Sequence, residues 1–215
     1  MNKIYRIVVF LIVALCVSGV PRQAVANVAD SAAILKKIYE GNAQVRTLQA
    51  PYTHHRVSGN DVSNRKGDFY YIAASQQLAM RYTEPEGRYF VVSDHHLYNK
   101  IGAIPLHFNT RRSKLMRLFG NCMVWAVRGD VKNIYKNNNV DMSVWEDEQE
   151  DCYVVEMKAR KGGNKGITRI VLKYDRTTCV IFYMEVDEKI GVDHIFRIGR
   201  QPISNQEITP SHFKI

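Results

Sequence analysis

Two blocks of the chain alternate apolar and polar residues with the two-residue period of a half-buried β-strand. Turn-forming residues such as Gly59, Asn60 and Gly191 separate the runs. Consecutive strands joined by short loops pair with one another, so both blocks predict an antiparallel meander. The predicted strands cover residues 52–58, 67–73, 78–83, 89–93 and 96–100 in the first block, and 141–145, 152–159, 167–174, 179–186 and 193–198 in the second.

One predicted strand, residues 78–83, carries an unusual apolar face. Leu78, Met80 and Tyr82 share that face, whereas Arg81 points to the other side of the strand by alternation. Methionine is flexible and polarisable and therefore packs against surfaces of no fixed shape. This face is thus a candidate for contact with an adaptable apolar partner.

Helical periodicity occurs at three places. Asp30 is a candidate cap for a first helix that carries Ile34, Leu35 and Ile38 and ends near residue 41. Between the two strand blocks, apolar residues recur at i, i+3, i+4, i+7 and i+8 and predict a basic amphipathic helix, which either closes one face of the sheet or is a movable cover over an apolar cavity. A short third helix is expected at residues 130–136. The apolar positions of the middle helix are Leu115, Leu118, Phe119, Cys122 and Met123.

The N-terminus has the pattern of an export signal. Lys3 and Arg6 precede an apolar run at residues 7–20, and Ala24 and Ala26 form a small-x-small cleavage site. The run is shorter than the ~20 residues of a spanning helix. A lipid-modified Cys16 is the alternative, but the residue before it is not small. We therefore expect a signal peptide at 1–26, followed by a single exported domain at 27–215.

The chain is basic, with a formal net charge of +9 that falls to +6 without the predicted signal peptide. This charge favours anionic lipid headgroups or acidic partners, or it serves solubility alone. No nucleic-acid-recognition motif is present, and nucleic acid is not expected as a partner. Cys122, Cys152 and Cys179 show no CxxC spacing and sit beside apolar residues, which favours buried free thiols.

Motifs that carry enzyme chemistry are missing. The sequence has no GxSxG, no HExxH and no GKS/T phosphate loop. His54 and His55 are adjacent on a predicted strand and so point to opposite faces, which leaves one ligand per face and argues against a metal site. We expect neither an enzyme nor a cofactor; an enzyme acting on lipids or glycans stays as a minor alternative.

Several segments together resemble the periplasmic outer-membrane lipoprotein carriers, the LolA-like family. They are TLQAPYTHHRV at 47–57, KGDFYYI at 66–72, LAMRYTEPEGRYFVVSDHHLYNK at 78–100 and the C-terminal TPSHFKI. The resemblance spans the predicted domain, and its most specific part is a Gly-Asp-aromatic strand followed by the strand at 78–83. Residues 101–139 match only in having helices.

The resemblance implies a mainly β (α+β) fold, an incomplete and strongly curved antiparallel β-barrel with helices packed in its concave mouth. It implies a monomeric periplasmic carrier that shields lipoprotein acyl chains or another lipid, with an inner-membrane lipoprotein-release complex and an outer-membrane acceptor as partners. An envelope lipid-sensing module of the same fold is the alternative. The lipid-binding residues expected for the cavity and lid are Ile38, Phe69, Tyr71, Leu78, Met80, Tyr82, Phe90, Val92, Leu115, Leu118 and Phe119.

The sequence departs from the family at one point. Family members carry an Arg, usually followed by Pro, after the Gly-Asp-aromatic strand, and this Arg latches the lid helices in the empty state. The corresponding residues 73–77 here are AASQQ, so the latch residue is absent. Arg81 is near but points away from the Leu78 face and does not take the role. How the lid is held, and which lipid is the cargo, are therefore open.

Overall fold

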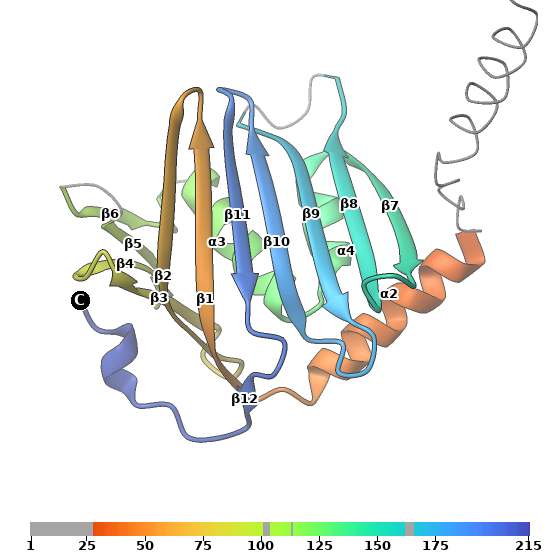
Figure 1. Ribbon diagram of the computed structural model, residues 1–215, viewed down its shortest axis with the longest axis horizontal. Helices are drawn as coiled ribbons and strands as arrows, with labels where there is room; N and C mark the ends of the chain where they lie inside the picture. The colour runs from red at the N-terminus through yellow and green to blue at the C-terminus, as the bar shows by residue number, and fades with distance from the viewer. Residues whose placement is uncertain (1–27, 101–103, 113, 162–165) are drawn as a thin grey trace, which may run out of the picture.

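The computed structural model describes residues 28–100, 104–112, 114–161 and 166–215; the predicted signal peptide lies outside this range. Twelve strands form one antiparallel sheet, and three α-helices and a 3-10 helix accompany it (Figure 1). The helices are α2 (Val28–Ala43), α3 (Lys114–Val127), α4 (Val131–Asn138) and η1 (Pro210–Phe213). The strands are β1 (Thr47–Ser58), β2 (Asp61–Ile72), β3 (Gln77–Glu84), β4 (Arg88–Ser93), β5 (His96–Lys100), β6 (Leu106–Asn109), β7 (Val140–Asp147), β8 (Cys152–Ala159), β9 (Ile167–Asp175), β10 (Ile181–Glu188), β11 (Val192–Ile198) and β12 (Ile203–Ser204).

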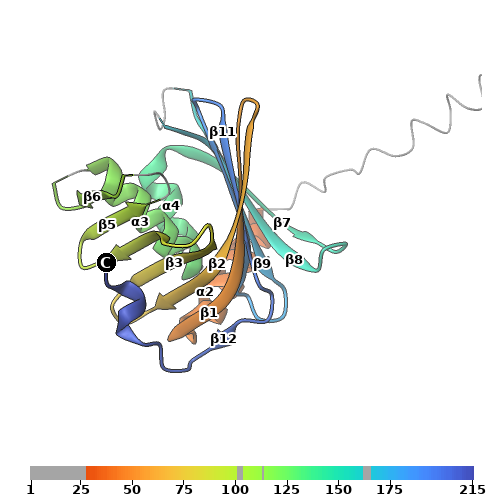
Figure 2. The same ribbon diagram turned by 60° about the vertical axis from the view of Figure 1, so that its left-hand side comes forward.

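The two predicted meanders join through their first and last strands. The sheet order is β6-β5-β4-β3-β2-β1-β11-β10-β9-β8-β7, with β1 antiparallel to β11 from Tyr52 opposite Ile198 to Ser58 opposite Val192. Among the described residues the end strands β6 and β7 do not pair, so the barrel is incomplete. The strongly curved sheet encloses α3 and α4 (Figure 2). This architecture confirms the predicted fold class.

The curvature has a local cause in β2. The pairing of β2 with β3 shifts register between Lys66 and Gly67, which is a bulge-like irregularity that bends a sheet. A side chain at Gly67 would clash with the backbone of Arg81 and would lie 2.9 Å from the Tyr52 ring. Glycine is therefore required where the strands approach most closely, and the first half of the sheet turns inward from this point.

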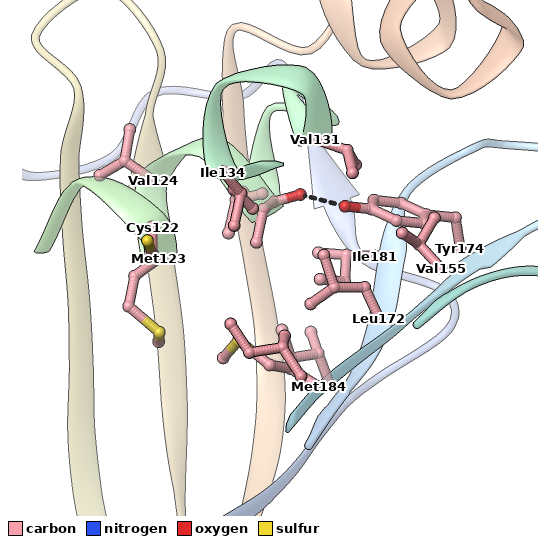
Figure 3. Packing of buried hydrophobic residues seen from close by; sticks show 14 of the residues in the cluster. Cys122, Met123, Val124, Val131, Ile134, Val155, Leu172, Tyr174, Ile181 and Met184 are labelled. Carbon is pink, nitrogen blue, oxygen red and sulfur yellow. Dashed lines mark hydrogen bonds between the residues drawn. The ribbon is translucent and has the colours of Figure 1, made fainter. Parts of the chain in front are cut away.

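The concave face and the helices share one apolar core. The buried side chains of α3 and α4, such as Met123 and Ile134, face Leu172 and Met184 of the sheet (Figure 3). Tyr174 of β9 is completely buried, and its hydroxyl donates a 2.8 Å hydrogen bond to the Ala126 carbonyl of α3. This bond joins the C-terminal part of α3 to the sheet.

The convex face of β2 to β4 is covered by the C-terminal segment. Arg81 points away from Leu78, as the alternation predicts, and its Nε donates to the His212 carbonyl at 2.9 Å while its second nitrogen donates to the Lys214 carbonyl. Ala79 on the same face is fully buried with Phe213. Both faces of β3 are therefore packed, the concave one toward the α-helices and the convex one against η1.

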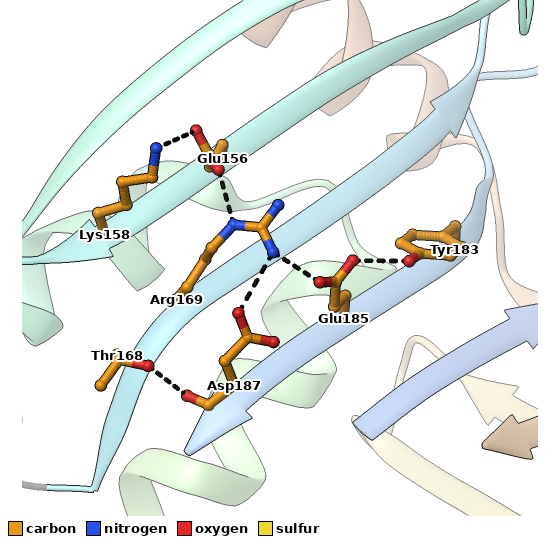
Figure 4. A network of polar contacts seen from close by, with 7 residues as sticks. All are labelled: Glu156, Lys158, Thr168, Arg169, Tyr183, Glu185 and Asp187. Atoms are coloured by element: carbon orange, nitrogen blue, oxygen red, sulfur yellow. Dashed lines mark hydrogen bonds and ion pairs between the residues drawn. The ribbon is translucent and has the colours of Figure 1, made fainter. Parts of the chain in front are cut away.

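The convex face of β8 to β10 carries an ion-pair network beside a small apolar cluster that includes Val154 and Val171. Arg169 of β9 donates to Glu156 at 2.7 Å and to Glu185 at 2.6 Å, and it contacts Asp187 at 3.2 Å (Figure 4). Burial opposes ionisation of Glu156, but its hydrogen bonds from Arg169 and Lys158 outweigh that effect and lower its pKa. The network holds these three strands together on the side that carries no helix.

Most predicted elements are present, with corrected ends. Asp30 lies inside the first turn of α2 and is not its cap, because the helix begins at Val28. The short strands β6 and β12 and the helix η1 were not predicted, since they carry too few residues for a periodic pattern. Cys122, Cys152 and Cys179 are buried free thiols, as expected. No described helix is long and apolar enough to cross a bilayer.

Candidate functional site

A cavity of about 140 Å³ lies between α3 and the concave face of the sheet. Its lining is divided into two kinds of side chain. The apolar part is Met80, Phe90, Met123, Val186 and Phe196, and the polar part is His54, Tyr82, Asn99, Glu188 and His194. The site is therefore an apolar hollow with one polar side.

Strand pairing brings these residues together from both halves of the chain. Met80 of β3 stands opposite Phe90 of β4. His54 of β1 stands opposite Phe196 of β11, and their rings stack with centroids 4.2 Å apart. The β1–β11 junction thus forms the middle of the cavity wall, and Met123 of α3 covers it from the opposite side.

The polar residues form a directed chain of hydrogen bonds. The Tyr82 hydroxyl lies 3.0 Å from His54 Nδ1, and His54 Nε2 lies 3.0 Å from His194 Nδ1. His194 Nε2 lies 3.3 Å from a Glu188 oxygen. Arg65 also approaches His54 Nδ1, at 3.5 Å, and a guanidinium can only donate. His54 Nδ1 is therefore the acceptor, and each ring donates from Nε2 toward Glu188.

Burial keeps both histidine rings neutral. It lowers the pKa of His54 to about 3, and electrostatic interactions with His194 and with the positively charged Arg65 act in the same direction. Burial also lowers the pKa of His194, against the opposing effect of Glu188. On the polar side of the cavity, the donor and acceptor roles of the two neutral rings are consequently fixed by their hydrogen bonds.

The packing beneath α3 is loose at a second point. A void of about 20 Å³ adjoins the cavity and shares Met123 and Val186 with it. Its other walls come from α4 and the β9–β10 face, including Ile134 and Leu172. Because protein interiors are normally close-packed, these two voids leave unfilled space beside Met123 of α3.

The residues predicted from the sequence divide into three groups. Met80, Tyr82 and Phe90 line the cavity. The side chains of Leu115, Leu118 and Phe119 belong to α3 but lie outside the described residues. The remaining predicted residues belong to the core rather than to the cavity lining, with Val92 half-buried against it; these are Ile38, Phe69, Tyr71, Leu78 and Val92.

Sequence reasoning missed much of the wall. It considered His54 only as a metal ligand, although its alternation with Tyr52 places it on the same inward face. His194, Glu188, Val186 and Phe196 gave no local signal, because their role depends on the pairing of β11 with β1. Among the described residues no group of three His, Cys, Asp or Glu side chains is placed to hold a metal ion.

Several solved structures have a similar fold. MucB superposes with a TM-score of 0.52 at 14% identity over 87% of this chain and 63% of MucB. A LolA superfamily protein from Nitrosomonas europaea gives 0.40 at 10% over 86% and 97%, and the lipoprotein LppX of Mycobacterium tuberculosis gives 0.47 at 8% over 85% and 99%. No protein-family model and no curated protein matches the sequence.

These likenesses establish the fold and nothing finer. The chain spans 63% of the length of the MucB structure, so part of that protein has no counterpart here. Structures described as a LolA superfamily protein and as an outer membrane lipoprotein-sorting protein domain are among those found, with TM-scores of 0.40 and 0.41. What the cavity binds has to be argued from its own residues.

Proposed function

We propose that the protein is a periplasmic carrier that shields the acyl chains of a lipoprotein or another lipid between the inner and the outer membrane. The observation that carries the proposal is the apolar hollow under α3. Two of its walls are methionines, Met80 and Met123, which adapt to chains of no fixed shape. The exported domain, the release complex and the outer-membrane acceptor belong to the same proposal. Export rests on the predicted signal peptide, and the two partners rest on the family resemblance.

The size of the cavity supports a role for α3 as a lid. Ligand sites usually measure about 300–1,000 Å³, whereas the hollow holds about 140 Å³. An acyl chain therefore needs α3 to move outward, and the loose packing at Met123 makes this helix the element that gives way. The predicted lid residues Leu115, Leu118 and Phe119 lie on the same helix.

Energetics permit both uptake and release. Burying roughly 15 methylenes at about 0.8 kcal/mol each supplies on the order of 12 kcal/mol before any costs. Displacing α3 from Met184 and its other core contacts costs free energy, which reduces the net free energy of lipid binding. The remainder sets an affinity from which a membrane acceptor is able to remove the lipid.

Met80→Glu tests the proposal. A carboxylate at this position enters the cavity beside Tyr82 and penalises an acyl chain, so the variant should stay folded by circular dichroism yet yield far less lipid in mass spectrometry of an organic extract. Val62→Glu is the matched control, because Val62 is 54% exposed. Ala79, the neighbour of Met80, is unsuitable since it is buried under the C-terminal segment.

Two outcomes would count against the carrier. Normal lipid recovery from folded Met80→Glu would show that this wall does not touch acyl chains. Unfolding of Met80→Glu, with Val62→Glu intact, would assign Met80 to a packed core and not to a ligand site.

A lipid-sensing module is the second candidate. MucB, which shares the fold, has been solved in complex with MucA, so the fold is compatible with a protein partner. A sensor would bind lipid without passing it on. Incubation of loaded protein with acceptor vesicles separates the two functions: a carrier transfers its lipid to the vesicles, and a sensor retains it.

A further inference from the structure

A buried positive charge lies behind the polar side of the cavity. Arg65 of β2 is 9% exposed and stands opposite His54 in the β1–β2 ladder. Its guanidinium contacts His54 at 3.5 Å and interacts electrostatically with Tyr82, and both partners are neutral cavity residues. Within the described part of the chain Arg65 forms no ion pair with a carboxylate. A guanidinium stays charged in proteins, so this burial is uncompensated.

Two further arginines add to the same field. Arg88 of β4 stands opposite Tyr82, and Arg56 of β1 is the diagonal neighbour of Arg65. Burial lowers the pKa of Arg65, and the charges of Arg88 and Arg56 lower it further. Arg56 pairs with Asp61 at 3.0 Å, whereas Arg88 makes no ion pair among the described residues. The β2–β4 end of the cavity is therefore short of negative charge.

The opposite end of the polar chain has a different character. Glu188 of β10 lines the cavity and accepts from His194. Its carboxylate repels an anion from the β10 side, and Arg65 and Arg88 attract one on the β2–β4 side. Apart from Asn99, the rest of the wall is apolar and offers an inorganic ion little in exchange for its hydration.

We propose that the cavity binds an anionic amphiphile, with its alkyl chain against Met80, Phe90 and Met123 and its charged group at the Tyr82 end, where Arg65 and Arg88 supply the counter-charge. The inference rests on the proposed lipid-binding function and adds the class of ligand. It accounts for the buried Arg65, because a bound phosphate or carboxylate supplies the ion-pair partner that the described residues do not provide.

Paired ligands that differ only in charge test this assignment. The lipid-free protein is loaded with Nile red, a neutral dye, which is displaced by palmitate, by methyl palmitate or by inorganic phosphate. Wild-type protein should bind palmitate at least about tenfold more tightly than methyl palmitate, the typical effect of one charge-assisted contact. Phosphate, which lacks an alkyl chain, should not displace the dye.

Arg65→Met should reduce the palmitate preference to about twofold and leave methyl palmitate binding unchanged. Arg65→Lys retains the charge and should retain most of the preference. Lys66→Met is the matched control, because Lys66 is the next cation on the same strand but is exposed on the other face. If Arg65→Met does not fold, Arg88→Met is expected to give a smaller loss in the same direction.

The outcomes separate this inference from the function on which it rests. If wild-type protein binds neither lipid, the lipid-binding function itself fails. If it binds both equally, and Arg65→Met and Arg88→Met change nothing, the cavity takes lipid but has no anion site, and the inference is overturned. Phosphate that stabilises wild-type protein without displacing Nile red would reveal a site for free anions and would also overturn it.

Discussion

Tying α3 to the sheet is the sharpest perturbation of the proposed lid. Gly120 of α3 packs on Val92 of β4, and a Cβ at Gly120 would lie 3.5 and 3.7 Å from the two Val92 methyl carbons. Both are ordinary contacts, so a side chain fits. These distances put the two Cβ atoms about 4 Å apart, within the ~3.5–4.5 Å of a disulfide. Gly120→Cys combined with Val92→Cys should therefore form a cross-link between α3 and β4.

The cross-link has a calculable effect on stability. It closes a loop of roughly 30 residues, which in the chain-entropy treatment stabilises the folded state by roughly 3.5 kcal/mol. For a domain of this size that corresponds to a rise in Tm of roughly 10 °C. The oxidised variant should thus melt higher than its reduced form while losing uptake, because a cavity of about 140 Å³ cannot admit an acyl chain with α3 in place.

The assay compares Nile red and palmitate uptake by the oxidised and the reduced double variant, with cross-linking verified by mass spectrometry. Reduction should restore uptake, and each single variant should behave as wild type under both conditions. Cys122, Cys152 and Cys179 are buried, which limits exchange with the introduced pair. A fully cross-linked protein that loads as fast as the reduced one would refute displacement of α3 as the route of entry.

Two further predictions follow from the neighbouring contacts. The pKa of His54 is about 3 in the folded state, below its unfolded value of about 6.5, so the unfolded chain binds more protons between these values and stability should fall by up to about 1.4 kcal/mol per pH unit below pH 6.5. Urea denaturation from pH 7 to 4.5 should show a shallower decline in His54→Phe than in wild type or in His55→Gln, which changes the opposite face. Tyr174→Phe removes the hydrogen bond to the Ala126 carbonyl and should cost about 1–2 kcal/mol in urea denaturation while speeding dye uptake; unchanged stability and uptake would show that this bond does not hold α3.

The strands could be predicted because their information is local. Alternation marks the inward face of each strand from its own residues, and it placed Leu78, Met80 and Tyr82 on one side correctly. The closing pair of β1 with β11 has no such signal, since Tyr52 and Ile198 are far apart in sequence and only the folded sheet brings them together. The two meanders were therefore predicted correctly, but the β1–β11 pairing that forms the cavity wall was not predicted.

The polar part of the site shows the same limit. His54 could have been assigned to the cavity by extending the alternation from Tyr52. Because His55 is adjacent, the pair was considered only as possible metal ligands. The partner of His54, His194, lies on β11. The role proposed for Arg65 depends on its lack of a carboxylate partner among the described residues, and the sequence does not show which residues surround Arg65 in the fold.

The two features proposed for the cavity would act on different quantities because they lie on different elements. In the proposed carrier, α3 contributes Met123 and a movable apolar surface, and its displacement would govern how fast a lipid enters or leaves. Arg65 lies in the sheet beside His54, and at the proposed anion site its charge would govern which lipid is retained at equilibrium. A carrier needs this separation: if the group that selects the cargo also held the lid, tight selection would slow release. The latch Arg of LolA-like proteins has no counterpart at residues 73–77, and in the proposed carrier Arg65 would recognise cargo while packing and the Tyr174 hydrogen bond hold α3.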